Sequence, residues 1–231
     1  MTGPLSEPMR EPPSEPAPLA DARGWLADWR RRVAELYAEV RARAATDPAA
    51  AWELWRAERR ALYRDHPQSP VPAAERDAFR AVYWPYHDRF RATVAVTPAP
   101  PAPTGLALVP LALPNSGAES PAFDRVGTVR LPVAGGDVEL PLFWMRGYTG
   151  GLFLPLGDAT NGVETYGAGR YLLDGAKSAD LGGDPAAGTV VVDANFAFQP
   201  SCAFDPKWAC PLAPPENRID APIRAGERLT A

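Results

Sequence analysis

Residues 126–145, VGTVRLPVAGGDVELPLFWM, contain two runs of alternating apolar residues on either side of a glycine pair. Gly135 and Gly136 suit the two central positions of a tight hairpin turn, because both positions need positive φ. Residues two apart on a strand point to the same face, so the register of the turn decides which side chains are buried together. A two-residue turn here sets three apolar pairs on one face: Val133 with Val138, Leu131 with Leu140, and Val129 with Leu142. The stretch predicts an antiparallel hairpin with one core face.

Two prolines limit how this hairpin is paired. Pro132 and Pro141 fall on the opposite face, together with Arg130 and Glu139. Proline has no N–H for a strand ladder. We therefore expect that the two strands of this hairpin cannot both be central strands of a sheet at these positions.

Further short strand-like runs occupy the second half of the chain, and turn residues separate them. Phe90 to Val96 also alternates in the manner of a strand. This pattern predicts an α+β protein, mainly β, in which residues 89–231 form a small antiparallel β-barrel or sandwich. The runs are 106–113, 126–133, 138–145, 151–156, 169–174 and 189–198.

Residues 23–88 have helical periodicity instead. Asp47 followed by Pro48 is typical of an N-cap and a first-turn proline, and we expect a short third helix from Ser69-Pro70 to Val82. We predict a helical layer that packs on the β domain. The apolar stripes are Trp25, Trp29, Val33, Leu36, Tyr37 and Val40 on the first helix, and Trp52, Trp55 and Leu62 on the second.

The first 22 residues differ from both parts, since they hold six prolines and four acidic residues. Such a composition cannot bury enough apolar surface to offset the entropy of ordering, so we expect a disordered tail. It has no apolar core of a secretory signal, which favours a cytoplasmic protein. A net charge of −4 argues against a nucleic-acid partner. No apolar run reaches the roughly 18 residues of a membrane span.

Three segments carry more glycine and polar side chains than strand packing requires. They are LGDATNGVETYGAGRYLL (156–173), VVVDANFAF (190–198) and the proline-rich QPSCAFDPKWACPLAPPENRIDAPIRAGE (199–227). The residues that form a pattern across them are Asp158, Thr160, Gly162, Thr165, Tyr166, Gly167, Gly169, Arg170 and Tyr171, then Asp193, Asn195, Ala197, Pro200, Cys202 and Ala203, and finally Cys210, Pro211, Pro214, Pro215, Glu216, Asn217, Ile223, Ala225, Gly226 and Glu227.

Together these residues resemble the closing signature of the bacterial and archaeal family known as domain of unknown function 1684. The helical stretches WRAERRALYRDHPQSPV (55–71) and RDAFRAVYWPYHDRFR (76–91) are similar to its opening, so the resemblance spans residues 50–228. It implies helices followed by a mostly β domain. The family offers no activity to transfer.

The same polar residues support two hypotheses. In the first, they form a concave site of a small-molecule-binding or catalytic β domain, whose partner is a small anionic or carbonyl-bearing ligand held by Arg170. In the second, the protein is a non-enzymatic structural or interaction module, and an Arg170–carboxylate network holds the proline-rich end as an ordered strap. The catalytic candidates are Asp158, Tyr166, Arg170, Asp193 and Glu216, and the ligand-binding candidates are Thr165, Tyr166, Arg170, Tyr171, Asn195 and Asn217.

The positions and spacing of the histidines, glycines and cysteines limit which kinds of cofactor, metal or redox site the chain can contain. Gly167 and Gly169 lack the third glycine of a dinucleotide-binding turn, and His66 and His87 both lie in the helical half. We expect neither a cofactor nor a metal site from these residues. Cys202 and Cys210 have neither redox-motif nor zinc spacing, which leaves buried thiols, a disulfide and a thiol sensor open. The sequence also leaves open whether the protein is an enzyme or a homo-oligomer.

Overall fold

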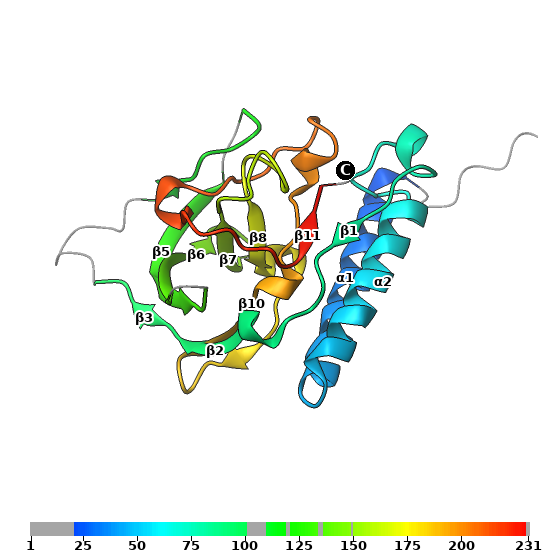
Figure 1. Cartoon of the computed structure of the whole chain (residues 1–231). Coiled ribbons are helices and arrows are strands. Elements are labelled where there is room, and N and C mark those ends of the chain that lie inside the picture. The colour runs from blue at the N-terminus through cyan, green and yellow to red at the C-terminus, as the bar shows by residue number, and fades with distance from the viewer. Residues whose placement is uncertain (1–20, 101–109, 119–120, 134–135, 149, 230–231) are drawn as a thin grey trace, which may run out of the picture.

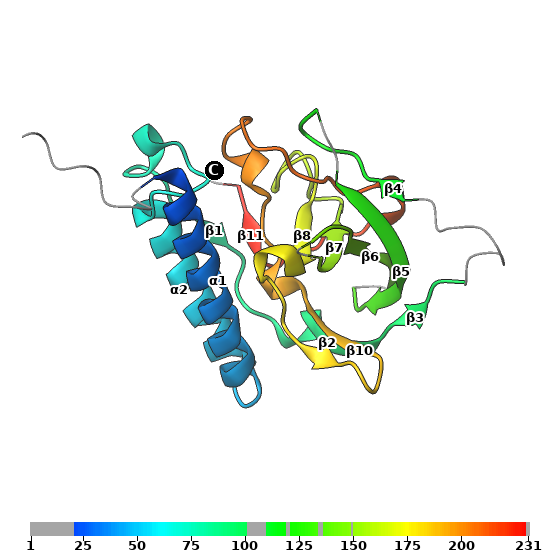
Figure 2. The same cartoon turned by 180° about the vertical axis from the view of Figure 1, so that it is seen from behind.

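Two antiparallel helices cover one side of a β body (Figures 1 and 2). The computed structural model describes residues 21–100, 110–118, 121–133, 136–148 and 150–229. Helix α1 spans Ala22–Ala44 and helix α2 spans Pro48–Asp65. Nearly all of the predicted 1–22 tail lies outside the described residues.

The two helices begin where the sequence predicts. Asp47 caps α2 by accepting the N–H of Ala50 at 2.9 Å, and Pro48 occupies the first turn. Asp21 caps α1 in the same way. Side-chain caps of this kind satisfy N–H groups that have no partner within the helix.

The expected third helix is wrong. A single 3-10 turn, Ala73–Glu75, follows α2, and Val82–Tyr83 forms strand β1. β1 pairs antiparallel with β11, Glu227–Arg228, near the end of the chain. Val82 and Tyr83 therefore pair with the chain end as a strand instead of continuing a helix.

The β body contains three sheets among the described residues. The largest follows the order β3-β5-β6-β7-β8, with β4 paired to β5; a second has the order β2-β10-β9; and β1 and β11 form the third. All of these strand pairs are antiparallel. The strands not yet given are β2 Arg91–Ala95, β3 Thr97–Pro98, β4 Leu111–Ala112, β5 Ala122–Leu131, β6 Val138–Met145, β7 Leu152–Leu156, β8 Arg170–Asp174, β9 Gly183–Asp184 and β10 Thr189–Asp193.

The chain is thus α+β and mainly β, but the sheet is not a closed barrel. Closure requires the two edge strands to pair, and among the described strands β3 and β8 do not. The free edge of β8 is instead bridged by the segment that follows β10, where the N–H of Tyr171 donates to the carbonyl of Phe198 at 2.9 Å. That edge is therefore occupied before it could meet β3.

The β5–β6 hairpin forms with a different register from the predicted one. Leu131 lies opposite Val138 and Val129 opposite Leu140, two residues away from the expected pairs. Because Pro132 has no N–H to continue the ladder, pairing ends at Leu131 and the connection becomes longer. A shift of two residues leaves every side chain on its predicted face, and Val129, Leu131, Leu140 and Leu142 are all 1% exposed or less.

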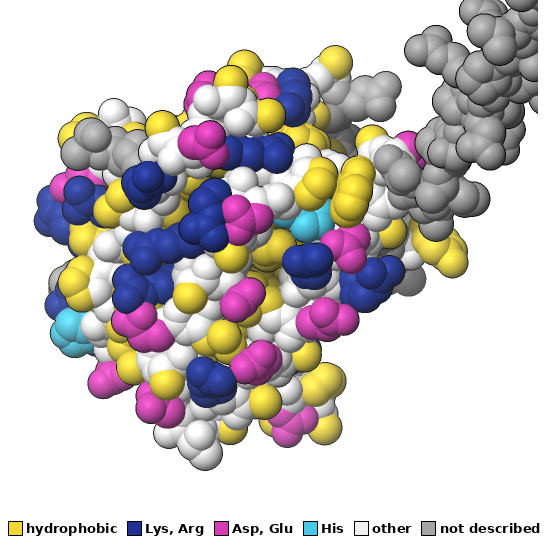
Figure 3. Space-filling view, turned by 90° about the vertical axis from the view of Figure 1, so that its right-hand side faces the viewer, with side chains coloured by type: hydrophobic (Ala, Val, Ile, Leu, Met, Phe, Trp, Pro, Cys, Tyr) yellow, Lys and Arg dark blue, Asp and Glu magenta, His cyan; other side chains and the backbone are white. Residues whose placement is uncertain are grey.

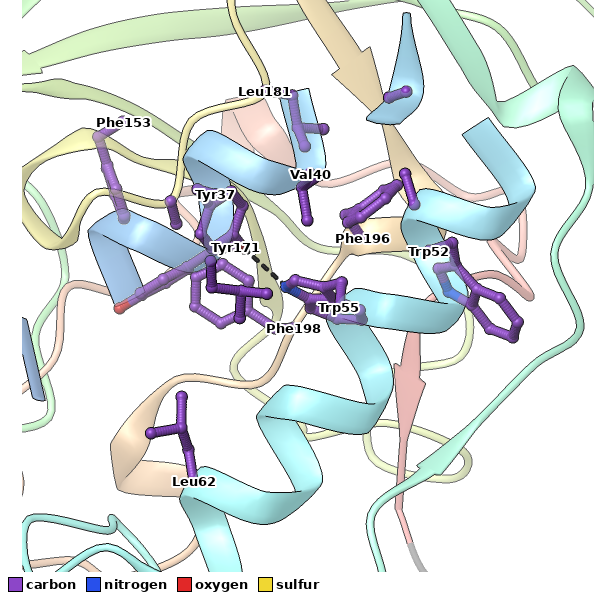
Figure 4. Close-up of a cluster of buried hydrophobic side chains, with 14 of the residues drawn as sticks. Tyr37, Val40, Trp52, Trp55, Leu62, Phe153, Tyr171, Leu181, Phe196 and Phe198 are labelled. Atoms are coloured by element: carbon purple, nitrogen blue, oxygen red, sulfur yellow. Dashed lines mark hydrogen bonds between the residues drawn. The ribbon is translucent and has the colours of Figure 1, made fainter. Parts of the chain in front are cut away.

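Two apolar clusters hold the layers together. One lies between the large sheet and the β2/β10 sheet, and contains Leu140, Leu156 and Val192. The other joins the helices to the β body around Trp55, whose indole N–H donates to Tyr37 Oη at 3.1 Å and whose ring lies 5.2 Å from that of Phe196 (Figure 4). The tryptophan-rich helix faces are therefore packing surfaces.

The outer face of the helical layer is charged. Basic and acidic side chains are interspersed there, with apolar ones between them (Figure 3). No described helix is long and apolar enough to cross a membrane.

Candidate functional site

Arg170 lies at the start of β8 and is completely buried. Its Nη2 donates to Asp158 Oδ2 and to the carbonyl of Ile223, both at 2.8 Å. Its Nη1 donates to the carbonyls of Ala225 and Glu227. The guanidinium therefore connects the turn after β7 to the last residues of the described chain.

The turn that carries Asp158 is closed by its own side chains. Asp158 Oδ1 accepts the N–H groups of Thr160 at 2.8 Å and Ile223 at 3.2 Å. The hydroxyls of Thr160 and Thr165 are 2.8 Å apart, and Asn161 Nδ2 donates to Thr165 Oγ1. Each of these polar groups is occupied by another group of the same turn or of the chain end.

Glycine at position 169 permits the entry into β8. Its φ is +100°, and a Cβ there would lie 2.7 Å from the carbonyl oxygen of Leu156. Gly162 also has positive φ. Gly167, in contrast, has neither a positive φ nor a close neighbour.

Asp193 and Asn195 form a second network at the end of β10. Asp193 Oδ1 accepts both the backbone and the side-chain N–H of Asn195, and its Oδ2 lies 3.2 Å from Arg91 Nη1. Asn195 in turn pairs through its amide with the N–H and C=O of His87, both at 3.0 Å. Burial raises the pKa of Asp193 to about 6, against the opposing effects of these hydrogen bonds and of Arg91.

Asn217 and Glu216 lie in a third location, apart from the Arg170 and Asp193 networks. Asn217 is buried, and its Nδ2 donates to the carbonyls of Pro141 at 2.9 Å and Pro155 at 3.0 Å. Glu216, next to it in the 3-10 turn Pro215–Asn217, is exposed. The contacts of the described residues thus place Arg170 with Asp158, Asp193 with Asn195, and Asn217 alone.

Two adjoining hollows between the helices and the β body are lined by none of Asp158, Arg170, Asp193 and Asn195. One of 260 Å³ opens between α1 and the loops after β8 and β10, and we call it the interlayer hollow. A smaller hollow of 60 Å³ adjoins it and shares Trp29, Pro70, Lys177 and Ser201 with its lining. Among the predicted site residues, Tyr171 lines the smaller one, although its hydroxyl donates to the carbonyl of Pro211. The interlayer hollow is lined by Leu26, Trp29, Arg30, Gln68, Pro70, Lys177, Ser201, Trp208, Ala209 and Cys210.

Both cysteines are free and buried, and Cys210 lines the interlayer hollow. Polar interactions with Cys210, and then with Ser116 and Tyr166, lower the pKa of Cys202 to about 6 against the opposing effect of burial. The pKa of Cys210 is raised by the same thiol contact and by burial. Burial, followed by the contact with Cys202, raises the pKa of Tyr166 to about 12.

The histidines are engaged in local structure. His66, at the end of α2, is buried, where its Nδ1 accepts the N–H of Gln68 and its Nε2 lies 3.1 Å from Asp28 Oδ2. The Nδ1 of His87 accepts the N–H of Arg89. Within the described part of the chain, no three His, Cys, Asp or Glu side chains gather in a way that could hold a metal ion.

Comparison with known proteins agrees with the resemblance seen in the motif. A family model described as "Protein of unknown function (DUF1684)" matches residues 77–228. The chain belongs to this family. The DUF1684 chain is also similar to the solution NMR structure of an uncharacterised protein from gene locus rrnAC0354 of Haloarcula marismortui, with a TM-score of 0.55 and 26% identity over 78% of this chain and 93% of that one. No curated protein matches.

Sequence reasoning missed the hollow of this DUF1684 protein because its lining comes from five separate segments. Lys177 carried one available signal, since it is one of two lysines in a chain with 24 basic residues. Trp208 carried another, as an aromatic residue between the two cysteines. Neither signal indicates a site until the fold brings both next to Trp29.

Proposed function

We propose that the protein binds a small anionic molecule with an aromatic or apolar body in the interlayer hollow. The observation that carries the proposal is the composition of the lining, in which two indole rings and two cations occur and, among the described lining residues, no acid. Sites for small molecules combine an apolar wall with a few polar groups that fix orientation.

The charges of the hollow favour an anion. Arg30 is exposed on α1 and has no ion-pair partner among the described residues. Lys177 is half-exposed, and its Nζ lies 3.4 Å from Asp174 Oδ2. A guanidinium on one wall and an ammonium on another can bind a carboxylate or phosphate from two sides. The volume of 260 Å³ is slightly below that of drug-sized sites, which supports a small metabolite.

The polar motif then serves as the frame of this site. Arg170 and Asp158 bind each other and the chain end, while Arg170 Nε has no hydrogen-bond partner among the described residues, and the amide of Asn195 binds the backbone of His87. We infer that residues 199–228 work as a strap across the β body and that Arg170 is its main attachment. The strap brings Ser201 and Trp208 to the hollow. The segment that Arg170 holds in place is therefore the same segment that supplies part of the binding surface.

Calorimetric titration with simple probes tests the proposal. Indole-3-acetate and benzoate supply a carboxylate on an aromatic body, while inorganic phosphate supplies charge alone. We expect the aromatic carboxylates to bind and to stabilise the protein, by about 2.7 kcal/mol at a concentration one hundred times Kd. Phosphate should bind more weakly, because it cannot contact the indole rings.

Two adjacent arginines on α1 give a matched pair of variants. Arg30→Ala removes a cation that lines the hollow, and we expect it to weaken binding by about tenfold, the equivalent of about 1.4 kcal/mol. Arg31→Ala makes the same change in charge, but Arg31 lines a different groove, between α1 and α2, and pairs with Asp28. Equal loss in both variants, or no binding of any aromatic carboxylate, would contradict the proposal.

The Arg170 network also supports a second candidate, a structural or interaction module without a small-molecule ligand. Its contacts join three carbonyls and a carboxylate, and the guanidinium is completely buried. Failure of the whole probe panel, combined with strong destabilisation by loss of Arg170, would favour this candidate over ligand binding.

A further inference from the structure

The smaller hollow of 60 Å³, which we call the inner hollow, lies where α1 and α2 meet residues 198–201. Trp29, Lys177 and Ser201 line both this hollow and the interlayer hollow, so the two adjoin each other. A space of 60 Å³ corresponds to the share of roughly two water molecules in the liquid. The inner hollow can therefore take a small end group of a ligand whose body lies in the interlayer hollow.

Tyr63 of α2 brings an unused hydroxyl to the inner hollow. The residue is 3% exposed and lines the hollow, and its hydroxyl has no hydrogen-bond partner among the described residues. Its ring is stacked on Trp29 at 6.3 Å, and the guanidinium carbon of Arg59 lies over it at 4.4 Å. Polar groups in a protein interior normally have a partner, so this hydroxyl lacks what a bound acceptor would supply.

Tyr37 of α1 and Arg59 of α2 line the same hollow and add two more donors. The hydroxyl of Tyr37 accepts the indole N–H of Trp55 at 3.1 Å (Figure 4) and donates to no described residue. Arg59 binds the carboxylate of Glu227 through Nε and Nη2, at 3.3 and 3.0 Å, and its Nη1 has no acceptor among the described residues. Three residues of the lining thus each have a donor that the described chain does not use.

The charges around the inner hollow favour a neutral acceptor. The carboxylate of Glu227 already offsets the charge of Arg59, and it would repel an anion placed next to that pair. Burial raises the pKa of Tyr37 to about 12 and that of Tyr63 well above its usual value, so both phenols keep their proton at neutral pH. A carbonyl oxygen can accept hydrogen bonds from these donors without bringing a charge into the interior.

We infer that the ligand is a small aromatic or apolar anion with an uncharged carbonyl group at the end opposite its charge, and that the inner hollow binds this carbonyl. The inference rests on the proposed function, since it places the anionic end near Arg30, which lines the interlayer hollow but not the inner one. Tyr63 determines the specificity for the carbonyl, because its hydroxyl has no other partner in the described chain.

Two probes of the same shape test the inference by calorimetric titration of the full-length protein. Para-acetylbenzoate has a carbonyl oxygen where para-isopropenylbenzoate has a methylene group, and the ring and carboxylate are the same. We expect the acetyl probe to bind about tenfold more tightly, because the isopropenyl group leaves the buried donors without an acceptor. Equal affinities, or binding of indole-3-acetate alone, would overturn the inference while the proposed function stands. Failure of every aromatic carboxylate would overturn both.

A matched pair of tyrosine variants assigns the specificity. Tyr63→Phe removes only the unused hydroxyl, so we expect a melting temperature close to that of the wild type and a several-fold fall in the preference for the acetyl probe. Tyr83→Phe is the control, since the hydroxyl of Tyr83 is also buried without a partner among the described residues, but Tyr83 does not line the inner hollow. This variant should keep the wild-type preference. A preference that persists in Tyr63→Phe, or one that falls equally in Tyr83→Phe, would overturn the part assigned to Tyr63.

Discussion

The guanidinium of Arg170 joins parts of the chain that are more than fifty positions apart, through Asp158 and the carbonyls of Ile223, Ala225 and Glu227. Trp84 covers it, with its ring 5.3 Å from the guanidinium carbon. A buried ion pair of this kind gains little net stability over an apolar replacement, but the loss of one partner leaves an uncompensated charge in the interior. The residue is thus more important for what its absence would expose than for the strength of the pair.

Arg170→Ala tests this role. We expect the free energy of unfolding to fall by about 3–5 kcal/mol, because Asp158 would remain buried without its cation. Thermal denaturation followed by circular dichroism measures this loss. Arg224→Ala is the control, since Arg224 pairs with Glu164 at the surface, and exposed pairs contribute about 0–1 kcal/mol. Similar losses in the two variants would show that the Arg170 network does not hold the chain end.

At the scale of strands, Asn217 completes a sheet that prolines interrupt. β6 and β7 pair through Phe143 and Trp144, and the described ladder does not extend to Pro141 or Pro155. The amide of Asn217 donates to the carbonyls of both prolines and so replaces the missing strand contact. This arrangement agrees with the expectation that Pro141 limits pairing on one side of the hairpin.

Asn217→Ala should therefore cost more than the loss of an ordinary surface amide. Two buried carbonyls would lose their donor, each at about 1–3 kcal/mol, so we expect a total loss of roughly 2–6 kcal/mol in chemical denaturation. Glu216→Ala, one position earlier and exposed, should change stability by less than about 0.5 kcal/mol. A small effect of Asn217→Ala would mean that water or a shifted strand satisfies these carbonyls.

The same elements show what could be predicted from the sequence. Periodicity and the Asp47-Pro48 cap place the two helices, because these signals are local to the elements they form. The faces of the strands could be predicted, but the register of the hairpin could not. The alternation of apolar and polar residues is the same before and after a shift of two residues, so it does not distinguish the two registers. The prediction of a closed barrel was wrong because closure depends on which segment pairs with the edge of β8, and a segment distant in sequence occupies that edge. The hollow was missed for the same physical reason, as its walls meet only in the folded chain.

At the scale of the whole molecule, the helical layer and the β body share one core. Arg59 of α2 pairs with Glu227 of β11 at 3.0 Å, with the two side chains 13% and 1% exposed. The same guanidinium lies over the rings of Tyr63 and Phe198. Trp52 adds a hydrogen bond to the carbonyl of Asn195. Contacts this extensive between layers predict a single cooperative unit rather than two domains.

Thermal unfolding followed by two probes tests this unity. Four of the seven tryptophans lie on the helices, so tryptophan fluorescence reports mainly on the helical layer and its interface. The near-UV circular dichroism of tyrosine and phenylalanine also reports on the β body. We expect coincident transitions in the wild type. Arg59→Met should lower stability by about 3–5 kcal/mol, because Glu227 becomes an unpaired buried carboxylate, and the two transitions should move together. Arg43→Met breaks only an exposed pair with Glu39 on α1, and should cost about 0.3–0.5 kcal/mol. A fluorescence transition that precedes the other would instead show that the helices detach before the β body unfolds.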